Sequence, residues 1–257
     1  MLSSDNDTPF ELPFPRNSFF INRPEIINDL DSHFDYDGAG LKTVVLHGLG
    51  GYGKTQIALE YAYSSMGHKL YSTVVWVDAR SSSTIESSAE NFINRAVVQP
   101  LLRKVAKGPY IASPQYIFVS IAQQLGINVD TRGGIDFDQE ALEKKIAEDS
   151  IRILGDWLTQ RENERCLLIA DNFDNPTDKS TLSSLNKLLP NNDKGHLLVV
   201  TRSTDPASFQ LKGDIHYVKV GGFDEDKGET LLGYLSKVDM VHLKMQNVPG
   251  TLKCAIS

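Results

Sequence analysis

The feature that most constrains this chain is the glycine-rich segment Gly48-Leu49-Gly50-Gly51-Tyr52-Gly53-Lys54-Thr55. The compact apolar run Thr43-Val44-Val45-Leu46 precedes it, and residues 54–63, with apolar side chains at helical spacing, follow it. Glycines let a backbone wrap closely around an anion and point its amide N–H groups inward. A buried parallel strand, a glycine turn and a helix in this order predict a loop that binds phosphate groups.

The two residues that close the segment have defined roles in such a loop. Lys54 is expected to neutralise charge on β- and γ-phosphates, and the Thr55 hydroxyl is expected to ligate Mg²⁺. The positive end of the following helix adds to the attraction. We therefore predict that residues 48–55, with the adjacent Gln56, bind ATP or ADP together with Mg²⁺. The alternative is an ordinary glycine-rich turn with an incidental Lys-Thr pair, which the strand and helix on either side disfavour.

The rest of the chain alternates between expected strands and helices. Apolar runs predict four further strands at 73–77, 166–170, 197–201 and 215–220. Helical spacing predicts helices near 24–33, 54–63, 116–125, 139–158, 181–188 and 224–236. Strands separated by helices imply a central, mostly parallel five-stranded sheet flanked by helices on both faces. With the phosphate loop, this predicts a three-layer α/β P-loop NTPase fold.

Two charged residues follow apolar strands and are further candidates for the site. Asp171 ends the run Leu167-Leu168-Ile169-Ala170, and a parallel sheet would carry its carboxylate to the edge that holds the loop. It could there hold Mg²⁺ through water, although aspartate is also common in turns. Arg202 follows Leu198-Val199-Val200-Thr201 and could reach a γ-phosphate, which would distinguish ATP from ADP. The alternative is a surface arginine paired with Asp205 or Asp174.

Composition limits the other function classes. The chain has 26 basic and 33 acidic residues, a net charge of −7, which argues against nucleic acid as a partner. Two distant cysteines, Cys166 and Cys254, do not form a disulfide scaffold, and Cys166 is expected in the core with Trp76 and Trp157. No apolar run reaches the length of a membrane span, and the N-terminus lacks the features of a signal peptide. The expectation is a cytoplasmic protein without membrane contact.

The expected organisation is an extended lead-in at 1–18, a nucleotide-binding domain at 19–236 and a tail at 237–257. Within the domain, residues 93–115 contain four basic and no acidic residues, together with the breakers Pro100, Gly108, Pro109 and Pro114. This composition predicts an inserted loop with a short helix. Its positive charge could contact an acidic partner, but a solvated excursion is the simpler interpretation.

The ordered motifs resemble those of the NB-ARC subgroup of STAND signalling ATPases, the nucleotide switches of NOD-like receptors, particularly fungal ones. Residues 13–17 and 20–25 resemble the family's opening segment, 75–79 its second-strand motif, 168–174 its metal-binding strand, and 200–202 its threonine-arginine sensor. The resemblance implies that Ile21 and Arg23 lie against the adenine. It also implies cytoplasmic signalling through protein partners.

Three departures from the family pattern affect what the resemblance implies. Asn22 replaces a glycine of the opening segment, near the adenine contact. Asn172 stands where many members have a second acidic residue that orients the attacking water, so hydrolysis should be slow unless Asp174 substitutes. The sequence also ends at Ser257, before the helical and winged-helix segments that close over ADP in the family.

Three functions remain open on this basis. The first is a regulatory switch whose ATP-bound and ADP-bound states present different surfaces to partners. The second is an enzyme with sustained turnover, a P-loop ATPase or a small-molecule kinase, in which Lys54, Asp171, Arg202 and Asp174 would be catalytic. The third is a truncated form that acts by self-association or by association with full-length relatives.

Overall fold

A computed structural model describes residues 10–34, 40–106, 114–130, 137–160, 163, 165–175, 177–189 and 195–234 of the chain. The strands are β1 Phe10–Glu11, β2 Lys42–His47, β3 Thr73–Asp78, β4 Cys166–Asp171, β5 His196–Thr201 and β6 Asp214–Lys219. The helices are α1 Pro24–His33, α2 Lys54–Gly67, α3 Ser82–Phe92, α4 Gln99–Ala106, α5 Pro114–Gln124, α6 Gln139–Leu158 and α7 Lys179–Leu188. Residues 225–234 are also helical. The tail predicted at 237–257 lies outside the described residues.

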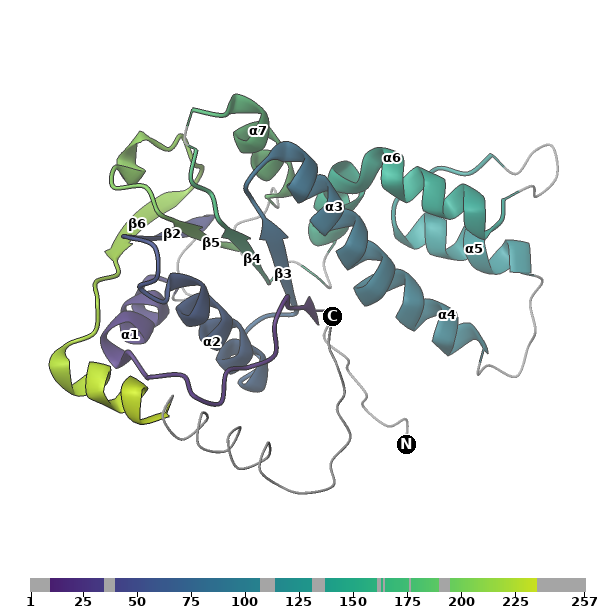
Figure 1. The fold of residues 1–257 in the computed structure, drawn as a ribbon. Coiled ribbons are helices and arrows are strands. Elements are labelled where there is room, and N and C mark those ends of the chain that lie inside the picture. Colours follow the sequence, from purple (N-terminus) through teal and green to yellow (C-terminus); the bar gives the residue numbers. More distant parts are fainter. Residues whose placement is uncertain are drawn as a thin grey trace, which may run out of the picture.

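The strands form one sheet in the order β1-β3-β4-β5-β2-β6, and all the described pairings are parallel. Figure 1 shows α1 and α2 on one side of this sheet and α3, α6 and α7 on the other. The predicted three-layer α/β fold with five parallel strands is therefore confirmed. The two-residue strand β1, at the edge beside β3, is an addition that the sequence did not reveal.

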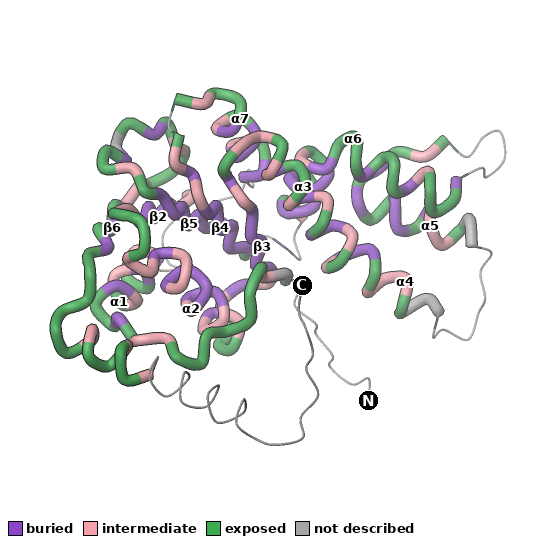
Figure 2. The backbone as a smooth tube through the Cα atoms, viewed as in Figure 1, coloured by how far each residue is buried: buried purple, intermediate pink, exposed green. Residues whose placement is uncertain are grey.

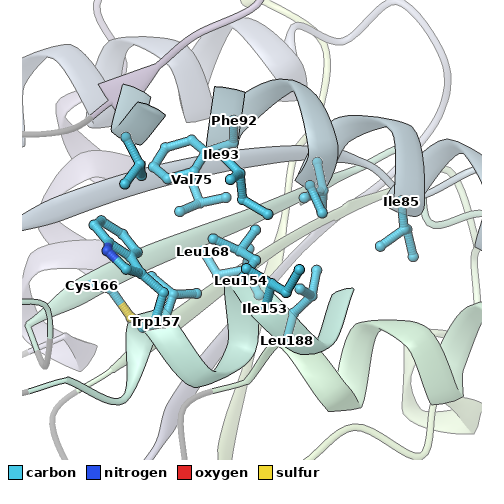
Figure 3. Close-up of a cluster of buried hydrophobic side chains, with 14 of the residues drawn as sticks. Val75, Ile85, Phe92, Ile93, Ile153, Leu154, Trp157, Cys166, Leu168 and Leu188 are labelled. Atoms are coloured by element: carbon cyan, nitrogen blue, oxygen red, sulfur yellow. The ribbon is translucent and has the colours of Figure 1, made fainter. Parts of the chain in front are cut away.

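The strands are apolar throughout because helices cover both faces of the sheet. In β4, Leu167 and Ile169 pack on the side of α1 and α2, whereas Leu168 and Ala170 pack on the side of α3, α6 and α7. Figure 2 shows the resulting buried band through the strands, with exposed residues along the outer surfaces. Figure 3 shows the second of these cores, where Phe92 and Trp157 lie with ring centroids 5.9 Å apart.

Two helical segments differ from the expectation. Helix α3 was not predicted, although Ile85, Ala89 and Phe92 recur at helical spacing and Ser81 caps its first turn by accepting from the Thr84 N–H. The prediction for 93–115 was an inserted loop with a short helix; residues 93–106 are helical throughout and form the π-helix η1 Ile93–Val98 and then the short helix α4. Buried Val97 and Val98 account for this, because burying apolar side chains outweighs the breaker at Pro100.

Pro100 is the second residue of α4, directly after η1, where the helical hydrogen-bond pattern changes from π to α and a residue without an N–H is tolerated. Residues 107–113 lie outside the described parts, so the insertion itself stays a prediction. Cys166 is buried in the core as expected, and burial raises the pKa of its thiol to about 12. No helix in the described ranges is long and apolar enough to cross a membrane.

Candidate functional site

Three strands end at the same edge of the sheet and deliver the main candidate residues there. β2 leads into the glycine-rich loop, β4 ends at Asp171, and β5 ends at Thr201, directly before Arg202. The pairing places β5 between β2 and β4. Arg202 therefore leaves the sheet between the loop and Asp171, a central position that the sequence alone could not specify. The carboxyl ends of parallel strands are where open α/β sheets place their ligands.

The glycines of the loop hold backbone conformations that other residues rarely adopt. The φ angles of Gly51 and Gly53 are +80° and +82°, and that of Gly48 is +141°. A Cβ atom at Gly48 would lie 2.3 Å from the Val220 carbonyl oxygen, on the strand-end segment beside the loop. Only glycine allows this approach, so the start of the loop is fixed against the end of β6.

Lys54 begins α2 with its side chain folded back into the loop. The residue is 6% exposed, and its Nζ donates to the carbonyl oxygens of Gly48 and Leu49, both at 2.8 Å. Burial lowers the pKa of this ammonium group, Asp174 and Asp171 oppose the shift, and Arg202 adds to it. The ammonium is thus a partly desolvated positive charge within the loop, where its attraction for an anion is stronger than in water.

Thr55 and Asp171 connect the loop to the neighbouring acidic strand. The Thr55 hydroxyl donates to Asp171 Oδ1 at 3.1 Å, and the Asn172 N–H donates to the same oxygen at 3.0 Å. Burial raises the pKa of the Asp171 carboxyl, and these two hydrogen bonds oppose the increase. Nearby Asp78 and Asp174 raise this pKa further.

The Thr55 and Asp171 oxygens fit a magnesium site. Adjacent oxygen ligands of octahedral Mg²⁺ lie about 2.9 Å apart, which follows from its metal–oxygen distances of about 2.0–2.1 Å. The observed separation of 3.1 Å is close to this value, so Asp171 could ligate the ion directly as well as through the water expected from the sequence. A hydroxyl and a carboxylate are also the hard oxygen donors that Mg²⁺ prefers. A cation there would oppose the unfavourable effect of burial on the Asp171 charge.

Arg202 is held by Asp174 through both its backbone and its side chain. The Arg202 N–H donates to Asp174 Oδ1 at 2.6 Å, and Nε donates to Oδ2 at 2.7 Å. The second guanidinium contact, from Nη2 to Oδ2, is 2.5 Å. A Cβ at Gly50 would lie 3.7 Å from Arg202 Cδ, so the arginine stem passes beside the loop. The pairing with Asp174 that the sequence left open is therefore present, and it holds the arginine at the loop.

Asn172 adopts a left-handed backbone conformation, with a φ angle of +63°. Asparagine tolerates this region better than most residues. The turn is fixed on its far side, where the Phe173 N–H donates to the Val200 carbonyl oxygen at 3.0 Å. The residue at this position thus has a structural reason for its identity, beside any effect on hydrolysis.

These residues surround one cavity of about 890 Å³, within the size range of small-molecule sites. The predicted site residues in its wall are Gly50, Gly51, Gly53, Lys54, Thr55, Gln56, Asp171, Asp174 and Arg202. Gly48, Leu49 and Tyr52 belong to the loop but not to this wall. Ile21 and Arg23 are also outside the wall, and Arg23 instead contacts the back of the loop at the Tyr52 carbonyl oxygen, at 3.2 Å. A contact of these two residues with adenine stays a prediction.

The wall of the cavity beyond the loop was not predicted from the sequence. This part is formed by Pro13, Phe14, Trp76, Asp78, Arg80, Ser88, Asn91 and Phe92. Asp78 stands opposite Asp171 in the sheet register, so the strand-end argument that found Asp171 would also have found Asp78. Trp76 is 9% exposed, as a core residue should be, but it borders the cavity as well.

The segment before α1 is pinned along α2 and closes this side of the cavity. The Tyr63 hydroxyl donates to the Phe14 carbonyl oxygen at 2.8 Å, and Arg16 Nε donates to Glu60 Oε2 at 3.0 Å. These contacts hold Pro13 and Phe14 in the cavity wall. They join residues more than 40 positions apart in the chain, which explains why local sequence patterns did not reveal them.

Comparison with known proteins gives a limited set of similarities. No family model matches this chain. A nucleotide-binding leucine-rich repeat (NLR)-like protein of Hyaloscypha variabilis is 24% identical over 236 residues, which cover 90% of this chain and 22% of that protein. The chain therefore spans less than a quarter of the length of this relative.

Among solved structures, Cdc6p from Pyrobaculum aerophilum matches with a TM-score of 0.51 and 12% identity, over 88% of this chain and 52% of that one. The Aeropyrum pernix ORC2 protein, in ADPNP and ADP complexes, matches with a TM-score of 0.45 and 16% identity, over 88% and 55%. The chain spans about half the length of each. The Cdc6p match shows a shared fold, and this chain has the three-layer P-loop NTPase fold.

Proposed function

We propose that this chain is an ATP- and ADP-binding regulatory switch domain of the NOD-like-receptor type, with slow hydrolysis. The observation that carries the proposal is the 3.1 Å contact between the Thr55 hydroxyl and Asp171, with Arg202 leaving the strand between them. This arrangement supports a site for a polyphosphate with a cation. The buried Lys54 ammonium supplies the complementary charge.

Different residues would bind the phosphates and the Mg²⁺ ion. Amide groups of the glycine loop and the start of α2 would hold the phosphates, with Lys54 neutralising their charge. Thr55 and Asp171 would hold Mg²⁺, which when bound neutralises part of the β- and γ-phosphate charge. Asp78 at the end of β3 lies beside Asp171 in the register and adds negative charge on the cation side.

The proposed switch depends on the γ-phosphate, which ATP has and ADP lacks. A γ-phosphate would offer the Arg202 guanidinium a second anionic partner, in competition with Asp174. ADP has no such group, so the Arg202–Asp174 pair would persist in the ADP state. Because Asp174 also accepts the Arg202 backbone N–H, a change in this pair would alter the turn at residues 172–174.

Slow hydrolysis follows from the groups near the attacking water. The amide of Asn172 cannot take up a proton. Asp174 is the other acidic side chain on this turn, and the Arg202 backbone N–H would still occupy its Oδ1 if the guanidinium turned to a γ-phosphate. A nucleotide state that persists suits a regulatory domain better than an enzyme with sustained turnover.

The similarity to the NLR-like protein of Hyaloscypha variabilis supports placement in this signalling group. The motif order seen in the sequence agrees with this placement. Protein partners, either further copies or longer relatives, would then read the nucleotide state. The resemblance would place the base toward Ile21 and Arg23, which lie outside the wall of the main cavity.

Thermal unfolding with and without nucleotide tests the proposal. Ligand at a hundredfold excess over its Kd should stabilise the domain by about 2.7 kcal/mol. For a chain of this size that raises Tm by roughly 5–10 °C. The increase should appear with Mg-ATP and with ADP and should be lost in Lys54→Ala. No shift with either nucleotide in the unmutated protein would refute nucleotide binding.

Steady-state phosphate release separates the switch from an enzyme. We expect a rate well under about one per second, toward the low intrinsic rates of unassisted P-loop switches. A rate of about tens per second would contradict the switch and favour sustained turnover. Retained phosphate release in Lys54→Ala would identify a contaminating ATPase as its source.

A further inference from the structure

Arg23 joins three parts of the chain that are distant in sequence. Its Nη1 donates to the Tyr52 carbonyl oxygen at 3.2 Å, and its Nη2 donates to those of Gly221 and Gly222 at 2.9 and 3.0 Å. The guanidinium lies 4.9 Å from the ring centroid of Phe223. The residue is only 5% exposed.

We infer that Arg23 is a positioning residue that couples the phosphate loop to the outgoing helix at 225–234, an inference that rests on the proposed nucleotide switch. A buried guanidinium is stable only while its hydrogen bonds are made. Its Nε already has no hydrogen-bond partner within the described chain. Moving the Tyr52 carbonyl away from Gly221 and Gly222 would leave further donors unsatisfied, so the two segments move together.

The coupling acts through a single peptide unit of the loop. The carbonyl oxygen of Tyr52 and the N–H of Gly53 belong to the same planar peptide and point in opposite directions. Arg23 holds the oxygen at one end. A phosphate that accepts from the Gly53 N–H would hold the other end, and the two hydrogen bonds would polarise the peptide in the same sense. Nucleotide would therefore tighten the contact with Arg23.

The outgoing helix is attached to the same junction. The Tyr52 ring lies against Gly222, where an added Cβ would be 3.8 Å from the ring. Beyond Gly222, Lys227 Nζ contacts Glu25 Oε1 at 3.2 Å, and the rings of Phe19 and Tyr234 lie 5.7 Å apart. Helix 225–234 thus rests on the segment that carries Arg23, so a tighter junction should also hold this helix more firmly.

Hydrogen exchange of the full chain, with and without Mg-ATP, tests the inference. In the unmutated protein, nucleotide should slow exchange in the loop and also in residues 221–234, the latter by about fivefold or more, as a coupling of typical size would give. Arg23→Lys keeps the charge but lacks the planar fork that serves three carbonyls. In this variant nucleotide should still protect the loop, while its effect on residues 221–234 should fall below about twofold. Arg152→Lys, on α6 with its own aspartate partners, is the matched control and should behave like the unmutated protein.

The hydrogen-exchange results distinguish a failure of the coupling from a failure of nucleotide binding. Protection of residues 221–234 that is equal in Arg23→Lys and the unmutated protein would overturn the inference. Protection of the loop alone in the unmutated protein would also overturn it and leave nucleotide binding intact. Absence of protection everywhere would refute both.

A second variant covers the case in which Arg23→Lys does not fold. Phe223 is 38% exposed, so Phe223→Leu removes the ring beneath the guanidinium at little risk to the core. It should reduce the nucleotide effect on residues 221–234 by at least about half without changing protection of the loop. An undiminished effect in Phe223→Leu would overturn the inference.

Discussion

Replacing Asp171 by asparagine should separate the stability of the fold from its ability to bind nucleotide. Asparagine keeps an oxygen that can accept from the Thr55 hydroxyl and the Asn172 N–H, so both hydrogen bonds can persist. Burial raises the pKa of the Asp171 carboxyl in the folded protein. The charged form therefore costs stability, and this cost is complete above the folded pKa and absent below the unfolded one. At pH 7 the nucleotide-free Asp171→Asn protein should be at least as stable as the unmutated protein.

The same substitution should remove most of the stabilisation by Mg-ATP. An amide is a weaker magnesium ligand than a carboxylate, and losing such a group typically costs about 10–100-fold in affinity. At a nucleotide concentration that gives the unmutated protein about 2.7 kcal/mol, the variant would retain only about 1.4 to 0.4 kcal/mol. The increase in Tm would fall from roughly 5–10 °C to roughly 1–5 °C.

The assay is thermal unfolding at pH 7, in four conditions that combine nucleotide or none with Mg²⁺ or EDTA. EDTA should reduce the shift of the unmutated protein toward that of Asp171→Asn and should change the variant little. Asp31→Asn, at an exposed aspartate on α1, is the matched control. A full Mg-ATP shift in Asp171→Asn would refute the magnesium site. A large loss of Tm without nucleotide would refute the argument that the buried charge is unfavourable.

Three further predictions follow from other contacts. Arg202→Ala should weaken the binding of ATP by about 10–100-fold, as expected for loss of a hydrogen bond to a charged group, and the binding of ADP much less. Equal weakening of both affinities in calorimetric titrations would exclude a sensor role. His196 is buried and its ring forms a hydrogen bond with the Tyr71 hydroxyl. Burial lowers its pKa to about 4, so as pH falls below 6.5 the unfolded chain takes up a proton before the folded chain does. The free energy of unfolding should then decrease by about 3 kcal/mol as pH falls from about 6.5 to about 4, and His196→Asn should lessen this decrease in denaturant titrations. Asn172→Ala should lose about 1 kcal/mol because alanine is strained at a φ of +63°, whereas Asn172→Gly should not; equal losses would argue against backbone strain.

The parts of the fold that the sequence predicted are those with strong local patterns. The apolar runs of β2, β4 and β5 are continuous because both faces of the sheet are covered. Helix α1 begins at Pro24 and ends at His33, as predicted. The strand order could not be read in the same way, because pairing of β5 with both β2 and β4 depends on contacts between distant segments.

In the candidate site, too, local sequence signals predicted some residues, whereas contacts between distant segments place the others. The loop motif and the strand-end position of Asp171 are local signals, and they led to residues that the fold brings together. The positions of Phe14 and Arg23 depend on hydrogen bonds across 49 and 29 to 199 residues, respectively. Sequence spacing carries no information about such contacts. Helix α3 is a different case, because its apolar spacing was present but was obscured by its many serine residues.

Several unfavourable features of this fold are concentrated at one edge of the sheet. Asp171 is buried as a carboxylate, Lys54 is partly desolvated, and Asn172, next to Asp171 in the chain, holds a left-handed backbone conformation. A polyphosphate with Mg²⁺ would supply opposite charge to both ionisable groups without requiring a change in the core. The same groups that lower the stability of the free domain would therefore raise its affinity for nucleotide. We expect such a domain to respond to nucleotide with a large change in stability at this edge, which is the property that the proposed switch requires.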